Sequence, residues 1–342
     1  MVAVAVEAEE KTLAEKLSAL RDPATYNHAA HEVHALGTHY AWIFFAGAFA
    51  YKLKKPMHVE RMDNRSLAAR RHACYAELQL NRRLAPHVYL DVVPLLVSSS
   101  GTLSLHGAGE PAEWLVKMRR LSNSEFLDKR IRGQRLDLHD VHNVGELLAE
   151  FYRSRPASHL GEQAYFARLH SQVAANHLDM LSPELDLPVE LVHDVAHRQQ
   201  SFLTRHASLI AERAAQQKIV EGHGDLRPEH IHLGPPTCVI DCLEFDRDLR
   251  LHDPLEELAY LLIECEMLDA TLVGREILEI YATQNETGLN ELLLKFYCSH
   301  RASNRAKLVA WHLRDPSCRT QSDWRTLAER YLLLAHHHLD GL

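Results

Sequence analysis

Cysteine is scarce in this sequence of 342 residues, and no apolar segment is long enough to stand out as a membrane span. The longest stretch without a formally charged side chain, 33–51, approaches the ~20 residues of a membrane helix but contains two histidines and two glycines. The N-terminal residues turn acidic early and lack the basic segment and long apolar core of a secretory signal. The widely spaced thiols without a CxxC pair are typical of reduced cysteines: Cys74, Cys238, Cys242, Cys265, Cys298 and Cys318. We therefore expect a cytoplasmic protein that is not bound to a membrane.

An excess of positive charge is also absent. The sequence has 38 Lys and Arg against 46 Asp and Glu, a net charge of −8 with histidine neutral, so no general basic field attracts a polyanion and nucleic acid is not expected as a partner. The GxxxxGK[ST] motif is missing, which excludes a P-loop NTPase. Histidine is abundant at 25 residues, but these side chains do not follow a zinc-type spacing. A histidine-rich metal-binding protein is therefore a hypothesis with little support.

The first third of the chain combines helical and strand patterns. Leucines at helical spacing predict a helix within 7–21, and short apolar runs broken by glycines then predict strands near 33–36, 42–45 and 49–53. The last two form a hairpin that turns at Ala46-Gly47-Ala48. A helix over 66–84 and strands over 88–97 and 113–118 complete a small mixed unit.

From about residue 119 the pattern becomes helical, interrupted by a strand-rich segment over 218–246. We predict helices over 144–152, 165–180, 189–214, 254–267, 272–283, 289–312 and 323–339. At roughly 150 residues per domain, the length fits two units, with a boundary between 118 and 119. The expected fold class is α+β, with a small mixed β-sheet unit followed by a mostly helical one.

The segment 221–246 carries the most chemistry. It places Asp225 on an irregular loop with glycine and proline, and then predicts strands over 231–233 and 238–241, the second ending in Asp241. Two carboxylates on a loop and a strand end can face one ligand, which suits phosphoryl transfer: one positions or deprotonates a hydroxyl, and the other holds Mg²⁺ against nucleotide phosphates. The spacing alone is equally consistent with two aspartates in turns and caps.

The motif HGDLRPEHI at 223–231, followed by IDCLEF at 240–245, resembles the catalytic core of the aminoglycoside phosphotransferase-like kinases, relatives of choline kinase with a protein-kinase-like fold. The likeness is to an uncharacterised bacterial branch of that family. It implies that Asp225 is the catalytic base, that Asp241 is the principal Mg²⁺ ligand, and that Arg227 lies near the transferred phosphate. The family's IDxE strand is matched with one extra residue before Glu244.

One position departs from the resemblance. The family usually has asparagine, a second metal ligand, where this chain has His230. Imidazole is a poorer ligand for Mg²⁺ than for Mn²⁺ or Zn²⁺. Either the second ion is held differently, with help from Glu244, or this branch is altered in activity; we expect His230 still to face the metal.

The N-terminal unit fits the same family. Alternation places Lys52 and Lys54 on one strand face, and Ala50-Tyr51-Lys52 resembles the family's nucleotide-binding Val-x-Lys. Lys52 is the expected contact to the α- and β-phosphates, with Lys54 as the reserve candidate. Glu77, on the following helix, matches the glutamate that pairs with this lysine.

Two further parts of a nucleotide site are suggested more weakly. The segment LGTHYAW offers Gly37 and Thr38 in place of a glycine-rich phosphate loop, as in this kinase branch, where the loop is commonly degenerate. The strand at 113–118 would lead into a hinge where an adenine edge bonds backbone near Val116 to Met118, although it can equally be a plain sheet strand.

The segment Asp253-Pro254-Leu255-Glu256 is a helix start, with Asp at the N-cap, Pro at N1 and Glu at N3. We interpret it as structural. The acids that follow could line a site for a cationic substrate, but such charges more often form a solvated helix face: Glu256, Glu257, Glu264, Glu266 and Asp269.

The resemblance therefore implies a two-lobe protein-kinase-like fold, with residues 1–118 and 119–342 as the lobes and the nucleotide in the cleft between them. The implied activity is Mg²⁺-dependent transfer of a phosphate from ATP or GTP to a hydroxyl of a small molecule. The competing hypothesis is a nucleotide-binding regulatory protein without turnover, suggested by His230 and the sparse phosphate loop. Retention of both Asp225 and Asp241 favours the enzyme.

Overall fold

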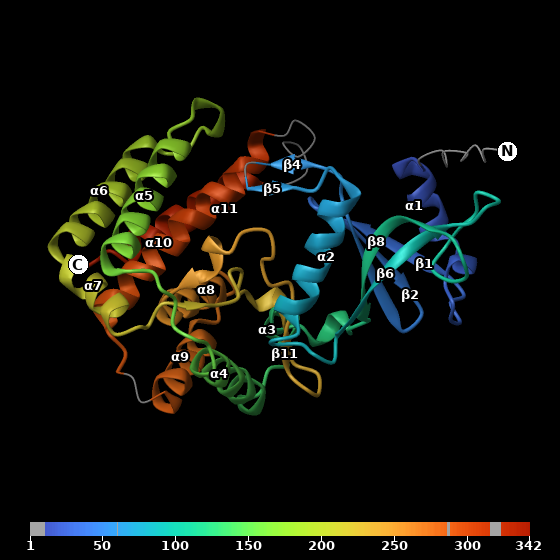
Figure 1. Cartoon of the computed structure of the whole chain (residues 1–342). Helices are drawn as coiled ribbons and strands as arrows, with labels where there is room; N and C mark the ends of the chain where they lie inside the picture. The colour runs from blue at the N-terminus through green and yellow to red at the C-terminus, as the bar shows by residue number, and fades with distance from the viewer. Residues whose placement is uncertain (1–10, 60, 286–287, 315–322) are drawn as a thin grey trace. The chain divides into compact units, whose positions relative to one another are not determined.

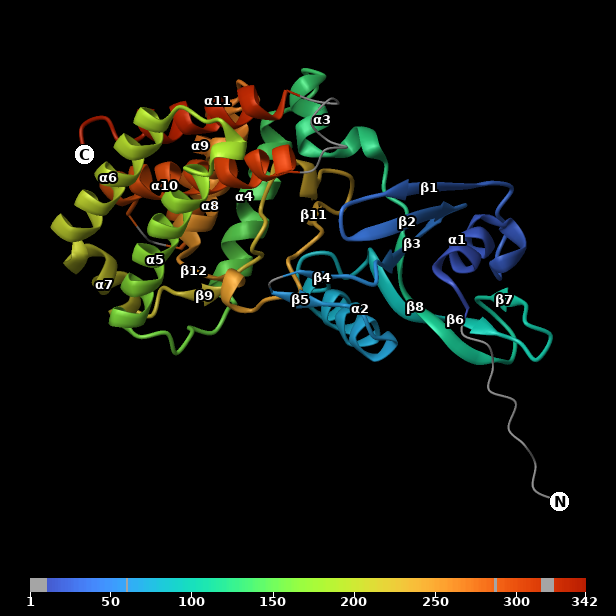
Figure 2. The same cartoon turned by 90° about the horizontal axis from the view of Figure 1, so that it is seen from above.

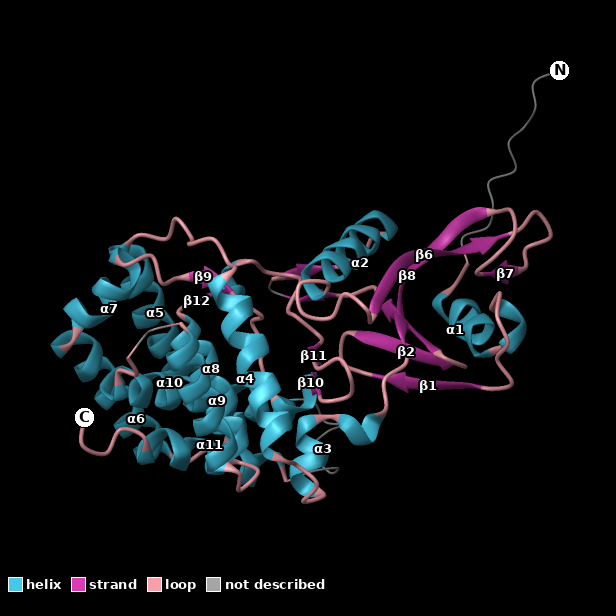
Figure 3. Cartoon of the chain, turned by 90° about the horizontal axis from the view of Figure 1, so that it is seen from below, coloured by secondary structure: helices cyan, strands magenta, loops and turns pink. Residues whose placement is uncertain are grey.

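The computed structural model describes residues 11–59, 61–285, 288–314 and 323–342, so Cys318 and the first residues of the predicted 7–21 helix lie outside the description. The chain forms two compact units. Unit 1 contains the chain up to Asn123 together with Val239–Asp246, and unit 2 contains Ser124–Cys238 and Arg247–Leu342. Figure 3 shows the main β-sheet in unit 1 and mostly helices in unit 2, which confirms the α+β class.

Unit 1 is built on a six-stranded antiparallel sheet with the order β1-β2-β3-β8-β6-β7. The three predicted N-terminal strands and the two that follow the helix are all present. Two short strands, β4 (His58–Val59) and β5 (Met62–Asp63), form a separate hairpin. The strands of the main sheet are β1 (Val33–Gly37), β2 (Ala41–Ala46), β3 (Phe49–Lys54), β6 (Tyr89–Val97), β7 (Leu103–Ser104) and β8 (Glu110–Arg119).

The two faces of this sheet carry different residues. One face buries Phe44, Tyr51 and Leu53 with Leu20 of helix α1 (Leu13–Arg21) in an apolar core. The other face carries Lys52 and Lys54, which contact helix α2 (Leu67–Asn81) through Glu77. Figure 1 shows α1 and α2 on opposite sides of the sheet. Strand alternation thus separates a core face from a charged face.

Unit 2 is a helical assembly (Figure 2). The single helix predicted over 189–214 is wrong, because the backbone leaves the helical region at His206 (φ −117°, ψ 27°), where no glycine or proline marks the break. The short helix α3 was not predicted. The helices are α3 (Leu127–Arg132), α4 (Leu138–Arg153), α5 (Glu162–Met180), α6 (Val189–Arg205), α7 (Ala207–Ala215), α8 (Pro254–Glu266), α9 (Thr271–Gln284), α10 (Glu291–Ala310) and α11 (Trp324–His337). Among the described residues, none of the helices combines the length and apolar character needed to cross a bilayer.

Helix α8 is buried along almost its whole length. The predicted structural start is confirmed: the Asp253 side chain accepts from the backbone N–H of Leu255 at 3.0 Å, with Pro254 in the first helical turn. The first two acids of this helix do not form a solvated face, and a contact between the later acids and a substrate stays a prediction. Glu256 and Glu257 are 2% and 1% exposed, because Arg301 pairs with Glu256 at 2.9 Å and the hydroxyl of Tyr152 donates to Glu257 at 2.7 Å.

His300, on α10, should make the stability of the protein depend on pH. Its side chain is buried, with Nδ1 3.7 Å from Glu256, and burial lowers its pKa to about 4 despite that carboxylate. Because the ordinary pKa is about 6.5, His300 binds a proton between about pH 6.5 and pH 4 in the unfolded chain but not in the folded chain. We expect the free energy of unfolding to fall as the pH drops from about 6.5 to about 4, by up to about 3 kcal/mol from this residue.

Denaturant unfolding of the wild type and His300→Gln between pH 7 and pH 4 measures this effect. The variant should lose part of the pH slope, whereas His139→Gln, on the exposed surface of α4, should keep it. Equal slopes in all three proteins would contradict the assignment to His300.

Candidate active site

Unit 1 contains a cluster of two lysines and three carboxylates. Lys52 Nζ lies 2.9 Å from Oε1 of Glu77 and 2.7 Å from Oδ1 of Asp241. Lys54 Nζ lies 2.6 Å from Oε2 of Glu77 and also pairs with Glu244. The predicted contact between Lys52 and Glu77 is therefore present, and the reserve candidate Lys54 shares the same glutamate.

The exposure of the side chains increases from one end of the cluster to the other. The side chains of Glu77 and Lys54 are 0% and 3% exposed, whereas those of Lys52 and Asp241 are 15% and 46% exposed. Burial lowers the pKa of Lys52, but Asp241, Glu77 and Glu244 outweigh it and raise that pKa well above its ordinary value. Lys52 is therefore a permanent cation at the open end, and Lys54 is the second cation at the closed end.

The segment that carries Asp241 is held by side chains of unit 1. The backbone N–H of Asp241 donates to the hydroxyl of Tyr89 at 3.1 Å, and that of Cys242 donates to Oδ1 of Asn81 at 2.8 Å. Asp241 does not end a strand as predicted, because β11 (Cys238–Val239) stops earlier and Asp241 has a left-handed backbone (φ 63°). Such a conformation is uncommon outside glycine, and here it accompanies the contact to Lys52. Nothing in the sequence indicated Tyr89 or Asn81.

The sheet face around Lys52 continues as an apolar surface. Strand register places Phe45, Ala50 and Met118 side by side, and next to them Ile43, Lys52 and Val116. Val116 and Met118 are paired with β3 on one side and with β6 on the other. The backbone of these two residues therefore does not lie at an open sheet edge, where it could bond a base as predicted. What they can offer a nucleotide is their side chains on this face.

An open depression lies where β8 ends. It has a volume of about 530 Å³, within the range of about 300–1,000 Å³ usual for ligand pockets, and Leu36 and Phe45 from the Lys52-bearing side of the sheet form part of its wall. The chain directly after β8 forms the rest, and the guanidinium of Arg120 lies over the ring of Phe45. Its lining residues are Leu36, Phe45, Arg120, Leu121, Ser122 and Asn123.

The turn at Gly37 and Thr38 is closed by its own hydrogen bonds. The Thr38 hydroxyl donates to the carbonyl of Ala41 and accepts from its N–H, both at 3.1 Å. A Cβ on Gly37 would lie 2.7 Å from the ring of Trp42, so glycine allows this ring to pack against the strand. The Thr38 side chain thus shapes the turn, and a contact from this turn to phosphate stays a prediction.

In unit 2, the loop around Asp225 brings the other predicted residues together. Oδ1 of Asp225 accepts a hydrogen bond from the hydroxyl of Tyr260 at 3.0 Å and lies 3.0 Å from Nε of Arg227. A second nitrogen of the same guanidinium, Nη1 of Arg227, lies 2.6 Å from Oε1 of Glu229. Burial raises the pKa of Asp225, but Arg227 and other cationic neighbours lower it more, so the net shift is downward. The carboxyl is therefore ionised at neutral pH.

The ring of His230 is oriented by this same loop. Nδ1 lies 2.8 Å from the carbonyl of Asp225, which only accepts, and Nε2 lies 3.3 Å from Nη2 of Arg227, which only donates. These contacts place a hydrogen on Nδ1 and use the lone pair of Nε2 as the acceptor. His230 can act as a metal ligand through Nε2 only after Arg227 moves away, a requirement that an asparagine amide oxygen would not impose.

Glu257 of α8 fixes the backbone just before Asp225. Its carboxylate accepts from the N–H of His223 at 2.9 Å and from the N–H of Gly224. Gly222 lies so close that an added Cβ would be 2.1 Å from Oε2 of Glu257. Glycine at 222 therefore keeps space for the carboxylate that holds the loop, a role not foreseen from the sequence.

Gly222→Ala should displace the Glu257 carboxylate and leave backbone N–H groups without their acceptor. We expect a loss of about 1–3 kcal/mol in the free energy of unfolding, measured by urea denaturation. Gly288→Ala, where an added Cβ meets no atom within 4 Å, should stay within about 0.5 kcal/mol of the wild type. Equal stability of the two variants would exclude this role for Gly222.

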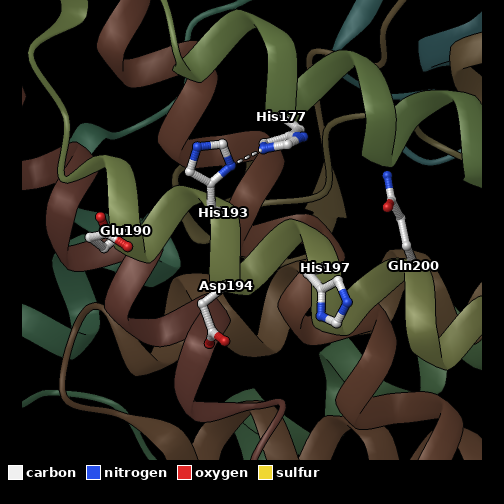
Figure 4. Close-up of a pocket in the computed structure, with 6 residues that line it drawn as sticks. All are labelled: His177, Glu190, His193, Asp194, His197 and Gln200. Carbon is white, nitrogen blue, oxygen red and sulfur yellow. Dashed lines mark hydrogen bonds between the residues drawn. The ribbon is translucent and has the colours of Figure 1, made fainter.

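A second depression, of about 470 Å³, lies on α5 and α6 and is lined mainly by histidines and acids (Figure 4). Nε2 of His177 lies 2.9 Å from Nδ1 of His193. Within the described ranges, no three His, Cys, Asp or Glu side chains are arranged to hold a metal ion. The described cysteines, including Cys238 and Cys242, are buried free thiols.

The unit 1 cluster fits the groups implied by the resemblance. Carboxylate oxygen is the ligand that Mg²⁺ prefers, and Asp241 presents such a group at the open end of the cluster. Lys52 adds a cation beside it that can meet a phosphate. Glu244 is occupied by Lys54 and only 13% exposed, so Asp241 is the principal candidate ligand in this unit.

The chain has sequence relatives in mycobacteria. Uncharacterised proteins of Mycobacterium tuberculosis and Mycobacterium bovis are each 30% identical to it over 311 residues, which cover 88% of this chain. The chain spans 59% of the length of these relatives. No family model matches the sequence.

Solved structures with similar folds are small-molecule kinases. A choline/ethanolamine kinase family protein of Mesorhizobium loti has a TM-score of 0.56 at 15% identity, covering 93% of this chain and 90% of its own. A choline kinase of Cryptosporidium parvum has a TM-score of 0.54 at 10% identity, covering 96% and 94%. The chain has the small-molecule kinase-like fold. A thermostable mutant of the aminoglycoside phosphotransferase APH(4)-Ia, in a ternary complex with AMP-PNP and hygromycin B, shares it with a TM-score of 0.52 at 13% identity, covering 97% of this chain and 100% of its own.

Within this small-molecule kinase-like fold, the predicted residues form two groups. Lys52, Glu77, Asp241 and Glu244 lie in contact in unit 1, with Val116 on the same sheet face as Lys52. Asp225, Arg227 and His230 lie in contact in unit 2.

Proposed function

We propose that the protein transfers the γ-phosphate of ATP or GTP to a hydroxyl of a small molecule in a Mg²⁺-dependent reaction. The observation that carries the proposal is the cluster in which Lys52 lies 2.9 Å from buried Glu77 and 2.7 Å from exposed Asp241. A lysine oriented by a glutamate beside an aspartate that can hold Mg²⁺ is the arrangement that protein kinases use for phosphoryl transfer. The kinase-like fold supports the same conclusion.

The residues of unit 1 would bind and orient the nucleotide. The Lys52 ammonium would contact the α- and β-phosphates, and Glu77 keeps that ammonium in place. Asp241 would hold Mg²⁺, which neutralises developing charge on the phosphates when bound. The depression lined by Leu36 and Phe45 offers an apolar wall for a base, and the backbone after β8 provides its polar side.

Asp225 of unit 2 would accept the proton of the acceptor hydroxyl. It is ionised at neutral pH, and its orientation is fixed by the Tyr260 hydroxyl at 3.0 Å. Oδ1 is engaged by Tyr260 and Arg227, so Oδ2 is the oxygen that would receive the proton. Choline kinase and the hygromycin B complex suggest small hydroxyl compounds as the acceptor class.

A nucleotide-binding regulatory protein without turnover is the second candidate. It is favoured by one observation: Nε2 of His230, at the position of the family's second metal ligand, accepts a hydrogen bond from Arg227. If Arg227 stays in place, Asp241 and Glu244 are the two predicted metal ligands that remain, and Glu244 is already paired with Lys54.

Nucleotide binding and turnover separate these proposals. The melting temperature should rise with ATP or GTP in the presence of Mg²⁺ or Mn²⁺, since a ligand at about 100 times its Kd stabilises by about 2.7 kcal/mol. Slow metal-dependent hydrolysis of the nucleotide alongside this shift supports the kinase. A shift without hydrolysis, in the presence of a broad set of hydroxyl compounds, supports the regulatory protein, and the absence of any shift contradicts both.

A further inference from the structure

The surroundings of Asp225 in unit 2 carry information about the acceptor. Tyr260, which donates to Asp225, lies on α8 one helical turn before Glu264, so both face the same side of that helix. Nε of Arg305, on α10, lies 2.8 Å from Oε1 of Glu264. Arg305 is also close enough to contribute to the lowered pKa of Asp225. A second guanidinium, in addition to that of Arg227, therefore stands near the proposed base.

The acids in this neighbourhood are already compensated. Glu229 pairs with Arg227 at 2.6 Å. Glu264 pairs with Arg305 and accepts hydrogen bonds from the hydroxyl of Tyr331 at 3.0 Å. Burial also raises the pKa of Glu264, which weakens it as a counter-charge. The acids and the two arginines are thus paired with one another, and a cationic acceptor would have to share Asp225 with Arg227.

Arg305 is suited to bind an anion. Its guanidinium lies over the ring of Tyr331, with 5.4 Å from the central carbon to the ring centroid, and its Nε is held by Glu264 at 2.8 Å. The side chain is 17% exposed, so it is accessible without being freely solvated. Guanidinium groups in such settings bind carboxylate and phosphate through paired N–H donors.

We propose that the hydroxyl acceptor carries an anionic group, a carboxylate or a phosphate, and that Arg305 binds that group while Asp225 takes the hydroxyl proton. This inference rests on the proposed function, because it assumes that Asp225 acts on an acceptor. It predicts that amines and quaternary ammonium compounds are not the preferred substrates of this chain. Arg305 is then the residue that determines specificity for the acceptor.

The test uses the full chain with ATP and Mg²⁺ and three matched classes of hydroxyl compound. Choline and ethanolamine represent cations, glycerol and ethylene glycol neutral acceptors, and glycerate, glycolate and glycerol 3-phosphate anions. ADP release above the acceptor-free rate and the shift in melting temperature are both measured. We expect at least tenfold higher kcat/KM for the best anion than for either cation, and comparison of glycerate with glycerol 3-phosphate distinguishes carboxylate from phosphate.

The variants separate recognition from folding. Arg305→Gln alone leaves Glu264 buried without its cation, so Arg305→Gln is combined with Glu264→Gln, and melting of the double variant establishes that it folds. The double variant should lose at least tenfold of the preference for anions, mainly through the KM of the acceptor. Arg305→Lys should retain part of the preference, and Arg198→Gln, on α6 and 28% exposed, should retain all of it.

Preference for a cation overturns the inference, as does a panel in which no anion stimulates ADP release or shifts the melting temperature. An unchanged preference in the folded double variant also overturns it. These outcomes count against the inference alone when the wild type hydrolyses ATP with Mg²⁺. Failure of the proposed function is the different case in which ATP is not hydrolysed and no compound of any class stimulates ADP release, with or without a melting shift.

Discussion

Asp225→Asn should lower phosphate transfer by about 10²- to 10⁴-fold, the range supplied by a positioned general base. Asparagine keeps the shape of the side chain and can still accept from the hydroxyl of Tyr260 (3.0 Å in the wild type). It cannot take up the proton of the acceptor. The rate of metal-dependent ADP release, measured with the acceptor or as slow hydrolysis, reports the loss.

The binding of nucleotide should survive this substitution. Lys52, Glu77 and Asp241 belong to unit 1 and keep their mutual contacts, so Asp225→Asn should show the same melting shift with ATP and Mg²⁺ as the wild type. Asp194→Asn, an exposed aspartate of α6 that pairs with Arg198, serves as the matched control and should keep full turnover. Full turnover in Asp225→Asn would remove this residue from the role of base.

Glu77→Gln should destabilise the protein by about 3–5 kcal/mol, the cost typical of removing one partner from a buried ion pair. Glu77 is fully buried and serves both Lys52 and Lys54, at 2.9 and 2.6 Å. Without its charge, two largely buried ammonium groups are left with Asp241 and Glu244. The change in the free energy of unfolding is measured by chemical denaturation, with a spectroscopic probe placed in the sheet of unit 1.

The same substitution should abolish the nucleotide-induced melting shift, because Lys52 loses the group that orients it. Glu110→Gln changes an exposed glutamate at the start of β8 and should stay within about 0.5 kcal/mol of the wild type. A Glu77→Gln protein as stable as this control would mean that the lysines are balanced by other groups.

The sequence predicted the part of the site that depends on local periodicity. Alternation along β3 placed Lys52 and Lys54 on one face, and the helix over 67–81 brought Glu77 to that face. Both are short-range patterns, and the family resemblance supplied their roles. The break at His206 shows the limit of periodicity, because no residue type there marks the end of a helix.

The remaining features depend on contacts between distant segments. Tyr89 and Asn81 hold the backbone of 241–242 from more than 150 positions away in the chain. The acids of α8 become buried because arginines of α10 pair with them. A charged residue on a helix is expected to be exposed unless a residue of opposite charge is known to pair with it. Here the pairing arginines lie some forty residues further along the chain.

The return of Val239–Asp246 to unit 1 has a consequence for any attempt to study the units as fragments. A polypeptide that ends at residue 123 would retain the whole β-sheet, both lysines and Glu77, but would lack Asp241 and Glu244. It would contain two cations and one anion where the intact chain has two cations and three anions. The charged cluster is therefore completed only when the chain beyond residue 246 has been synthesised, and a fragment that ends at residue 123 would leave Lys52 and Lys54 with Glu77 alone.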